Sequence, residues 1–179
     1  APRDGTRLRE LLNEALAVGD GPTAVRFPKG ALPAEVERVE RVGGIDVLRH
    51  DADADVLLVA FGPMVGLALE VADRIADQGI ASTGVEPRGA APLDPVLSTM
   101  AAAQARVVTI EDNGRHGGAG SLVAQLLRDR GVDTPLRVQA LPQQFLRQGK
   151  RAEVLVEAGL TSQEVARQVV EAVAGRDAF

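Results

Sequence analysis

The sequence predicts an α/β protein: a three-layer domain with a mostly parallel sheet, preceded by a separate helix–strand unit. The first observation is an unbroken apolar run, Val56–Phe61, which is typical of a strand covered on both faces. The second is a regular alternation of strand-like and helix-like segments after that run, joined by short connections. Such alternation builds right-handed βαβ units, whose strands lie parallel in one sheet.

The N-terminal unit consists of one helix and one strand. Leucines recur at helical spacing between charged residues over Thr6–Val18, which predicts a helix. The stretch Gly19–Pro22 ends it, since Gly caps helix C-termini and Pro cannot continue a helix. A short strand is expected at Thr23–Phe27, broken by the Pro-Lys-Gly that follows. Residues 31–43 show no strong period, so we interpret them as a linker.

Strands and helices alternate from residue 44 onward. Asp94 and Pro95 predict a helix start, as N-cap and first helical residue. Thr161 and Glu164 have the spacing of a capping box at the start of the last helix. The expected elements are an extended piece at 45–50, the strand at 56–61, a helix carrying Met64 to Ile75, a strand at 80–87, a helix at 94–105, a strand at 106–112, a helix carrying Leu122 to Leu127, a strand at 136–142 and a helix from 161.

Composition excludes several classes of function. The net charge of −5 argues against general nucleic-acid binding, which needs a basic face. The absence of cysteine excludes disulfides, thiolate metal sites and a cysteine nucleophile. No apolar run approaches the length of a membrane helix, and the charged start lacks the apolar segment of a signal peptide. We therefore expect a cytoplasmic protein without membrane or nucleic-acid partners. The missing initiator Met fits a piece of a longer chain.

The segment Ile110–Ser121 is rich in glycine and lies where a strand ends and a helix begins. Two interpretations stay open: an anion site at the helix N-terminus, or glycines that permit tight backbone packing. Packing is favoured because Glu111 and Asp112 would repel a phosphate. Glu111 and His116 are the candidate residues of a loop site, although no catalytic triad or metal-ligand spacing accompanies them.

Two cations flank the end of the first predicted strand. Arg26 would share a strand face with a small residue, so partial burial would require an acidic partner. Lys29 follows Pro28 at the strand's carboxyl end, where a lysine can hold a phosphate as a point charge. The alternative is an exposed lysine on a turn.

The ordered motifs GPTAVRFPKG, DVLLVAFG, VVTIEDNGRHGGAGS and AGLTSQEVARQV resemble the C-terminal part of the 1-deoxy-D-xylulose-5-phosphate synthase family, in the transketolase group. The resemblance implies that residues 1–30 are the tail of a pyrimidine-binding domain, 31–43 a linker, and 44–179 a transketolase C-terminal domain. It implies a homodimeric parent that uses thiamine diphosphate and Mg²⁺ to condense pyruvate with D-glyceraldehyde 3-phosphate. The product would supply isoprenoid, thiamine and pyridoxal biosynthesis.

The resemblance also implies what this chain contributes. The catalytic, cofactor and metal residues would lie in upstream domains, so the chain alone would bind no cofactor and be inactive. Lys29 stands where the family has a phosphate-binding Arg, and Arg26 is a second candidate for that contact. The helix and strand ahead of Pro28 would expose apolar surface. Two alternatives remain: the C-terminal domain of a 2-oxoacid dehydrogenase β-type subunit, and a free-standing binding or oligomerisation module.

Overall fold

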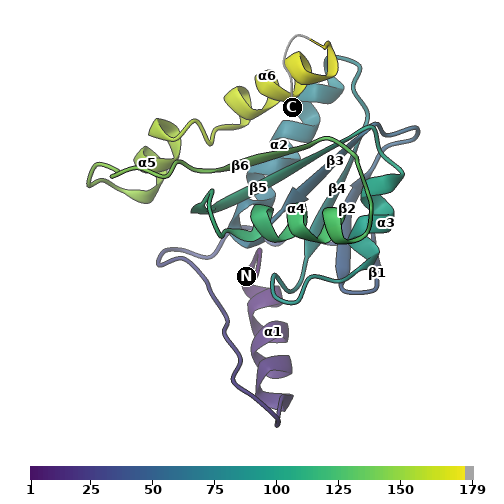
Figure 1. Ribbon diagram of the computed structural model, residues 1–179. Coiled ribbons are helices and arrows are strands. Elements are labelled where there is room, and N and C mark those ends of the chain that lie inside the picture. Colours follow the sequence, from purple (N-terminus) through teal and green to yellow (C-terminus); the bar gives the residue numbers. More distant parts are fainter. Residues whose placement is uncertain (176–179) are drawn as a thin grey trace.

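The structure is a computed structural model that describes residues 1–175 and contains one six-stranded sheet, ordered β1-β2-β4-β3-β5-β6 (Figure 1). Strands β4, β3, β5 and β6 are parallel to one another, whereas β2 runs antiparallel to β1 and β4. The predicted α/β class with a mostly parallel sheet is confirmed. The elements are α1 Gly5–Ala17, β1 Glu40–Val42, β2 Ile45–His50, β3 Val56–Ala60, a 3₁₀ turn η1 Gly62–Met64, α2 Val65–Ala76, β4 Ser82–Pro87, α3 Val96–Ala102, β5 Arg106–Gly114, α4 Ala119–Asp129, β6 Leu136–Leu141, α5 Arg151–Glu157 and α6 Ser162–Val173.

Strand β3 lies inside the sheet and supplies side chains to both hydrophobic cores. All five of its residues are buried. Val56, Leu58 and Ala60 join the core formed with α2 and α6, whereas Leu57 and Val59 join the core formed with α3 and α4. The strand therefore has no polar face, which is why its sequence is an unbroken apolar run rather than an alternating one.

Helices cover both faces of the sheet and produce the three predicted layers. Helix α2 buries a stripe at helical spacing against one face, and α6 packs beside it. Helices α3 and α4 cover the other face. Helix α1 does not join either layer: it extends from the sheet as an arm, and the chain returns along it (Figure 1). Residues 176–179, the end of the predicted 44–179 domain, lie outside the described residues.

Three local predictions are wrong or incomplete. The strand expected at Thr23–Phe27 is wrong, because those residues form neither helix nor strand and do not pair with any strand of the described sheet. The expected linker 31–43 is wrong at its end, since β1 pairs with β2 through Val42 and Ile45. Helix α5 was not expected, because seven residues carry too little periodicity to be recognised.

The Asp94 side chain makes the expected contact with the start of α3, although the helix begins at Val96 with Pro95 at its N-cap, one residue later than predicted, and Asp94 makes a second contact as well. Its Oδ1 accepts a hydrogen bond from the Val96 N–H at 2.9 Å, and its Oδ2 accepts from the Gly44 N–H at 2.8 Å. A side chain at Gly43 would come within 2.8 Å of the same carboxylate, so the β1–β2 turn needs glycine there. Asp94 thus joins the start of α3 to the sheet edge.

Candidate functional site

The carboxyl ends of the parallel strands form the candidate site. Strand β4, which follows β3 in the chain, lies on one side of β3, and the next strand, β5, lies on its other side. The order in which strands are added to the sheet therefore reverses at β3. Ligands of open α/β sheets bind beside such a reversal. A cleft of about 570 Å³ opens there between the end of α1, residues 22–26 and the ends of β3, β4 and β5. The N-terminal arm therefore forms one wall of this cleft.

A buried ionic cluster attaches the start of the arm to the sheet. The Arg3 guanidinium donates to Asp46 of β2 at 2.9 Å and to Glu86 of β4. Its Nε also donates to the Val36 carbonyl at 2.9 Å, which holds the returning chain beside the arm. These partners lie 43 and 83 residues from Arg3, and the sequence carries no local signal for them.

The pKa values of the two carboxyl groups in this cluster are shifted in opposite directions. Burial raises the pKa of Glu86 to about 7, although the hydrogen bond and charge of Arg3 oppose the rise. Burial also disfavours ionised Asp46, but hydrogen bonds from Arg41 and Arg3 outweigh it and lower the pKa of that carboxyl. Asp46 is therefore the anionic partner of the arginines, and Glu86 takes up a proton near neutral pH.

Asp112, at the carboxyl end of β5, holds two arginines from distant parts of the chain. Its Oδ1 accepts from Arg26 Nη1 at 2.7 Å, and its Oδ2 accepts from Arg151 Nη2 of α5 at 2.7 Å. The Arg26 side chain is 50% exposed, so the expected acidic partner is present, whereas the expected strand and the partial burial are not found. From the sequence, Asp112 is recognisable only as a carboxylate near a turn, and no pattern identifies Arg151 as its partner.

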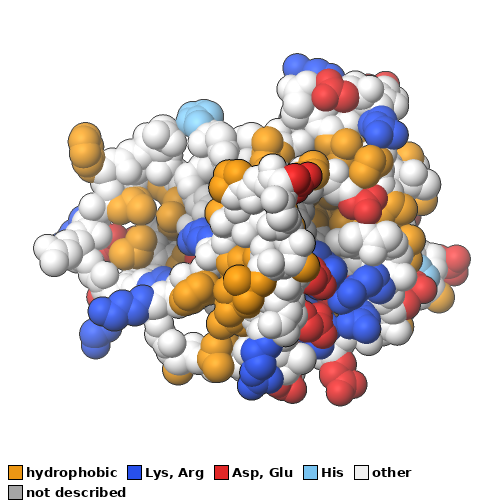
Figure 2. Space-filling model, turned by 90° about the horizontal axis from the view of Figure 1, so that it is seen from below, with side chains coloured by type: hydrophobic (Ala, Val, Ile, Leu, Met, Phe, Trp, Pro, Cys, Tyr) orange, Lys and Arg blue, Asp and Glu red, His pale blue; other side chains and the backbone are white. Residues whose placement is uncertain are grey.

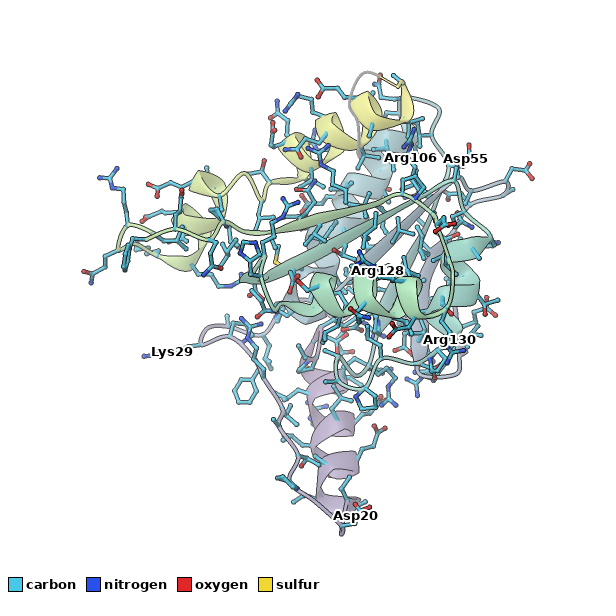
Figure 3. All side chains as sticks on the ribbon, viewed as in Figure 1. Asp20, Lys29, Asp55, Arg106, Arg128 and Arg130 are labelled. Carbon is cyan, nitrogen blue, oxygen red and sulfur yellow. The ribbon has the colours of Figure 1, made fainter. Side chains whose placement is uncertain are left out.

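Lys29 lies in the returning chain and points away from the rest of the molecule (Figure 3). Lys29 and the residues around it line a second, smaller cleft of about 320 Å³, formed with Leu8 of α1 and Pro63 of η1. Within residues 1–175 the Lys29 ammonium has no hydrogen-bond or ion-pair partner. The charge expected to meet a phosphate is therefore available to a group outside the described chain.

The glycine-rich turn before α4 is filled by a side chain of the protein itself. The Glu111 carboxylate is buried and accepts from the N–H groups of Ala119 and Gly120, each at 2.7 Å. An added Cβ would lie 2.5 Å from Glu111 Oε2 at Gly118 and 2.6 Å from Thr109 Oγ1 at Gly120. This geometry supports packing as the reason for these glycines, since an internal carboxylate occupies the anion position at the helix N-terminus.

The two loop candidates differ in burial: Glu111 is enclosed, whereas His116 is exposed on the turn.

The described residues do not fit the cofactors that the resemblance implies for the parent. No group of three or more His, Cys, Asp or Glu side chains among them could hold a metal ion. The N–H donors of the glycine-rich turn, which could cradle a diphosphate, already bind Glu111. No helix in residues 1–175 has the length and apolar character to cross a membrane.

Large apolar side chains are exposed on the arm. Leu16 of α1 is 84% exposed and Phe27 of the returning chain is 56% exposed. Leu12, Val18 and Leu32 are also exposed. Figure 2 shows hydrophobic side chains gathered near the middle of this face, with charged side chains around them. The apolar surface expected on the N-terminal unit is confirmed, and clustered apolar surface of this kind commonly marks a site of interaction.

Comparison with known proteins places the chain beside one protein family. The sequence model of the family described as "Transketolase, C-terminal domain" matches residues 43–165. Three curated bacterial proteins named 1-deoxy-D-xylulose-5-phosphate synthase are similar over nearly the whole chain. They come from Frankia casuarinae (53% identical, 98% of this chain), Thermobifida fusca (50%, 98%) and Mycolicibacterium vanbaalenii (51%, 97%). The chain spans only 28% of the length of each.

Solved structures have the same fold. A structure titled "Split gene transketolase, inactive beta4 tetramer" superposes with a TM-score of 0.84 at 28% identity, covering 98% of this chain and 57% of that one. A transketolase from Campylobacter jejuni superposes with a TM-score of 0.75 at 20% identity, covering 95% of this chain and 25% of that one. The second likeness shows the fold alone.

Proposed function

The chain belongs to the transketolase C-terminal domain family, and on that premise we propose that it is the C-terminal portion of a 1-deoxy-D-xylulose-5-phosphate synthase. The parent would decarboxylate pyruvate, join the two remaining carbons to D-glyceraldehyde 3-phosphate and release CO₂. One observation carries this proposal: the identity of 50–53% to synthases extends over 97–98% of the chain. That alignment includes most of residues 1–42, which the family model does not match.

The parent is proposed to use thiamine diphosphate with Mg²⁺, and the cofactor would supply the carbanion chemistry of the reaction. Since the described residues form neither a metal cluster nor a free diphosphate cradle, the upstream part of the protein would hold both. We propose that the exposed apolar arm packs against that upstream part. This arrangement would leave the chain alone inactive, and the structurally similar β4 tetramer is likewise titled inactive.

Within the parent, this chain is proposed to contribute Lys29 to the phosphate of the aldehyde substrate. Its ammonium extends from the arm without a described partner, beside the surface that the upstream domains would cover. A lysine offers a phosphate one compact charge rather than the two parallel hydrogen bonds of an arginine. The remaining proposals for the parent are assembly as a homodimer, a cytoplasmic location and a role in supplying isoprenoid precursors.

The function is tested by the products of the intact parent, expressed from its full coding frame. Pyruvate with D-glyceraldehyde 3-phosphate should give 1-deoxy-D-xylulose 5-phosphate and CO₂. Pyruvate with a lipoyl domain should give no acetylated lipoyl group. Lipoyl acetylation without sugar phosphate would instead identify a 2-oxoacid dehydrogenase subunit. A start or stop codon directly upstream of Ala1 would favour a free-standing module.

A further inference from the structure

We infer that Asp112 is a positioning residue for Lys29. It holds Arg26, and through Arg26 it fixes the segment of the arm that carries the lysine, while Arg151 of α5 braces the same carboxylate. The inference rests on the proposed function, in which Lys29 meets the substrate phosphate. It assigns to the sheet domain a share in the affinity for the aldehyde, although none of its own side chains would touch that substrate.

The geometry of the contact suits this role. Asp112 is 8% exposed, lies at the end of a buried strand and uses both carboxylate oxygens, one for each arginine at 2.7 Å. Burial alone would disfavour its charge, but the hydrogen bonds from Arg26 and Arg151 outweigh burial and keep the pKa of Asp112 below its ordinary value. The carboxylate is therefore ionised at neutral pH, and both contacts are charge-assisted.

The segment that carries Lys29 depends on such a contact. Residues 18–39 contain no helix or strand, so no ladder of backbone hydrogen bonds holds them. Only Phe27 and Pro28 separate Arg26 from Lys29, which limits the distance between the two backbones to about 10 Å. The ring of Pro28 fixes one of the intervening dihedral angles. Anchoring Arg26 therefore restricts where the Lys29 ammonium can lie.

The test measures steady-state kinetics of the intact parent with Asp112→Asn, which keeps the shape of the side chain and removes its charge. The matched control is Asp133→Asn, at an exposed carboxylate in the loop before β6. Two acceptors are compared: D-glyceraldehyde 3-phosphate and D-glyceraldehyde, which lacks the phosphate. Asp112→Asn should raise KM for the phosphorylated acceptor roughly tenfold, and KM for pyruvate and for D-glyceraldehyde by less than about twofold. The control should change none of these constants by more than about twofold.

A double variant links the effect to Lys29. After Lys29→Ala, the further change Asp112→Asn should raise KM for glyceraldehyde 3-phosphate by less than about twofold, because the charge being positioned is gone. Arg151→Gln, at a half-exposed residue, removes the second arginine from Asp112 and should raise KM for glyceraldehyde 3-phosphate in the wild-type background. This variant tests the inference if Asp112→Asn does not fold.

Equal increases with both acceptors, multiplicative effects in the double variant, or an Asp112→Asn enzyme that behaves like the control would each overturn the inference. A wild-type parent that makes no sugar phosphate would instead overturn the proposed function, and the inference with it. The two failures are therefore distinguishable.

Discussion

Lys29 is the residue on which the proposed substrate contact depends. Replacing it with Ala removes the positive charge that would face the substrate phosphate. This should raise KM for glyceraldehyde 3-phosphate by roughly tenfold or more, with a much smaller change in KM for pyruvate. Lys29→Arg keeps the charge and adds a bidentate fork, so its KM should stay within about threefold of wild type. Steady-state kinetics of the intact parent measure both. An equal rise in the two KM values would contradict a phosphate role, with thermal stability checked alongside.

Gly120 tests the packing explanation of the glycine-rich turn. A Cβ there would lie 2.6 Å from Thr109 Oγ1 and 2.7 Å from Val138 Cγ1, inside the contact between α4 and the sheet. We expect Gly120→Ala to lower the free energy of unfolding by about 1–3 kcal/mol in urea denaturation. Gly66→Ala is the control, since nothing lies within 4 Å of its added Cβ. It should be neutral or slightly stabilising, and equal losses at both sites would refute the packing explanation.

The raised pKa of Glu86 predicts how its contribution to the free energy of unfolding changes with pH. Because burial raises its pKa from 4.5 to about 7 in the folded chain, against the effect of Arg3, folding favours the protonated form. Its contribution to stability is complete below 4.5 and is lost as the pH rises through about 7. Glu86→Gln imitates the neutral form, so the stability of wild type relative to this variant should fall over that pH range. Urea denaturation at several pH values measures the difference, and a rise would show that Glu86 is ionised.

Helix α6 shows which part of a predicted cap forms. The Thr161 hydroxyl accepts from the Glu164 N–H at 3.2 Å, as expected of an N-cap. The Glu164 carboxylate instead accepts from Arg167 and Gln168, and these hydrogen bonds lower its pKa to about 2. Thr161→Ala should therefore cost about 1 kcal/mol of unfolding free energy, whereas Thr161→Ser keeps the hydroxyl and should cost much less. Denaturant titration compares the two variants, and equal losses would mean that the cap is unimportant.

The elements that could be predicted from the sequence are those whose burial leaves a local pattern. Strand β3 is covered on both faces and is apolar throughout, and α2 repeats its buried residues at helical spacing. Strand β1 could not be predicted, because two of its three residues are exposed and only its pairing with β2 makes it a strand. The strand expected at Thr23–Phe27 has the right composition, but no partner within the described chain. Composition alone does not specify pairing.

Long-range contacts join the arm to the sheet, and the sequence predicts only a part of them. An acidic partner for Arg26 was expected from a strand that does not form, and the partner itself, Asp112, lies 86 residues away in the sequence. The Arg3 cluster, which joins the arm to β2 and β4, left no trace in the sequence. Conversely, the exposed apolar face of the arm was expected, because a lone helix and its return segment bury little by themselves.

The central claim is that this chain is one part of a thiamine-diphosphate enzyme whose cofactor site lies upstream. Isothermal titration calorimetry with thiamine diphosphate and Mg²⁺ tests it most directly, with the 179-residue chain in one experiment and the intact parent in the other. We predict saturable heat with the parent and none with the chain alone, since its glycine-rich turn is filled by Glu111 and its described residues form no metal cluster. Saturable binding by the chain alone would contradict the claim.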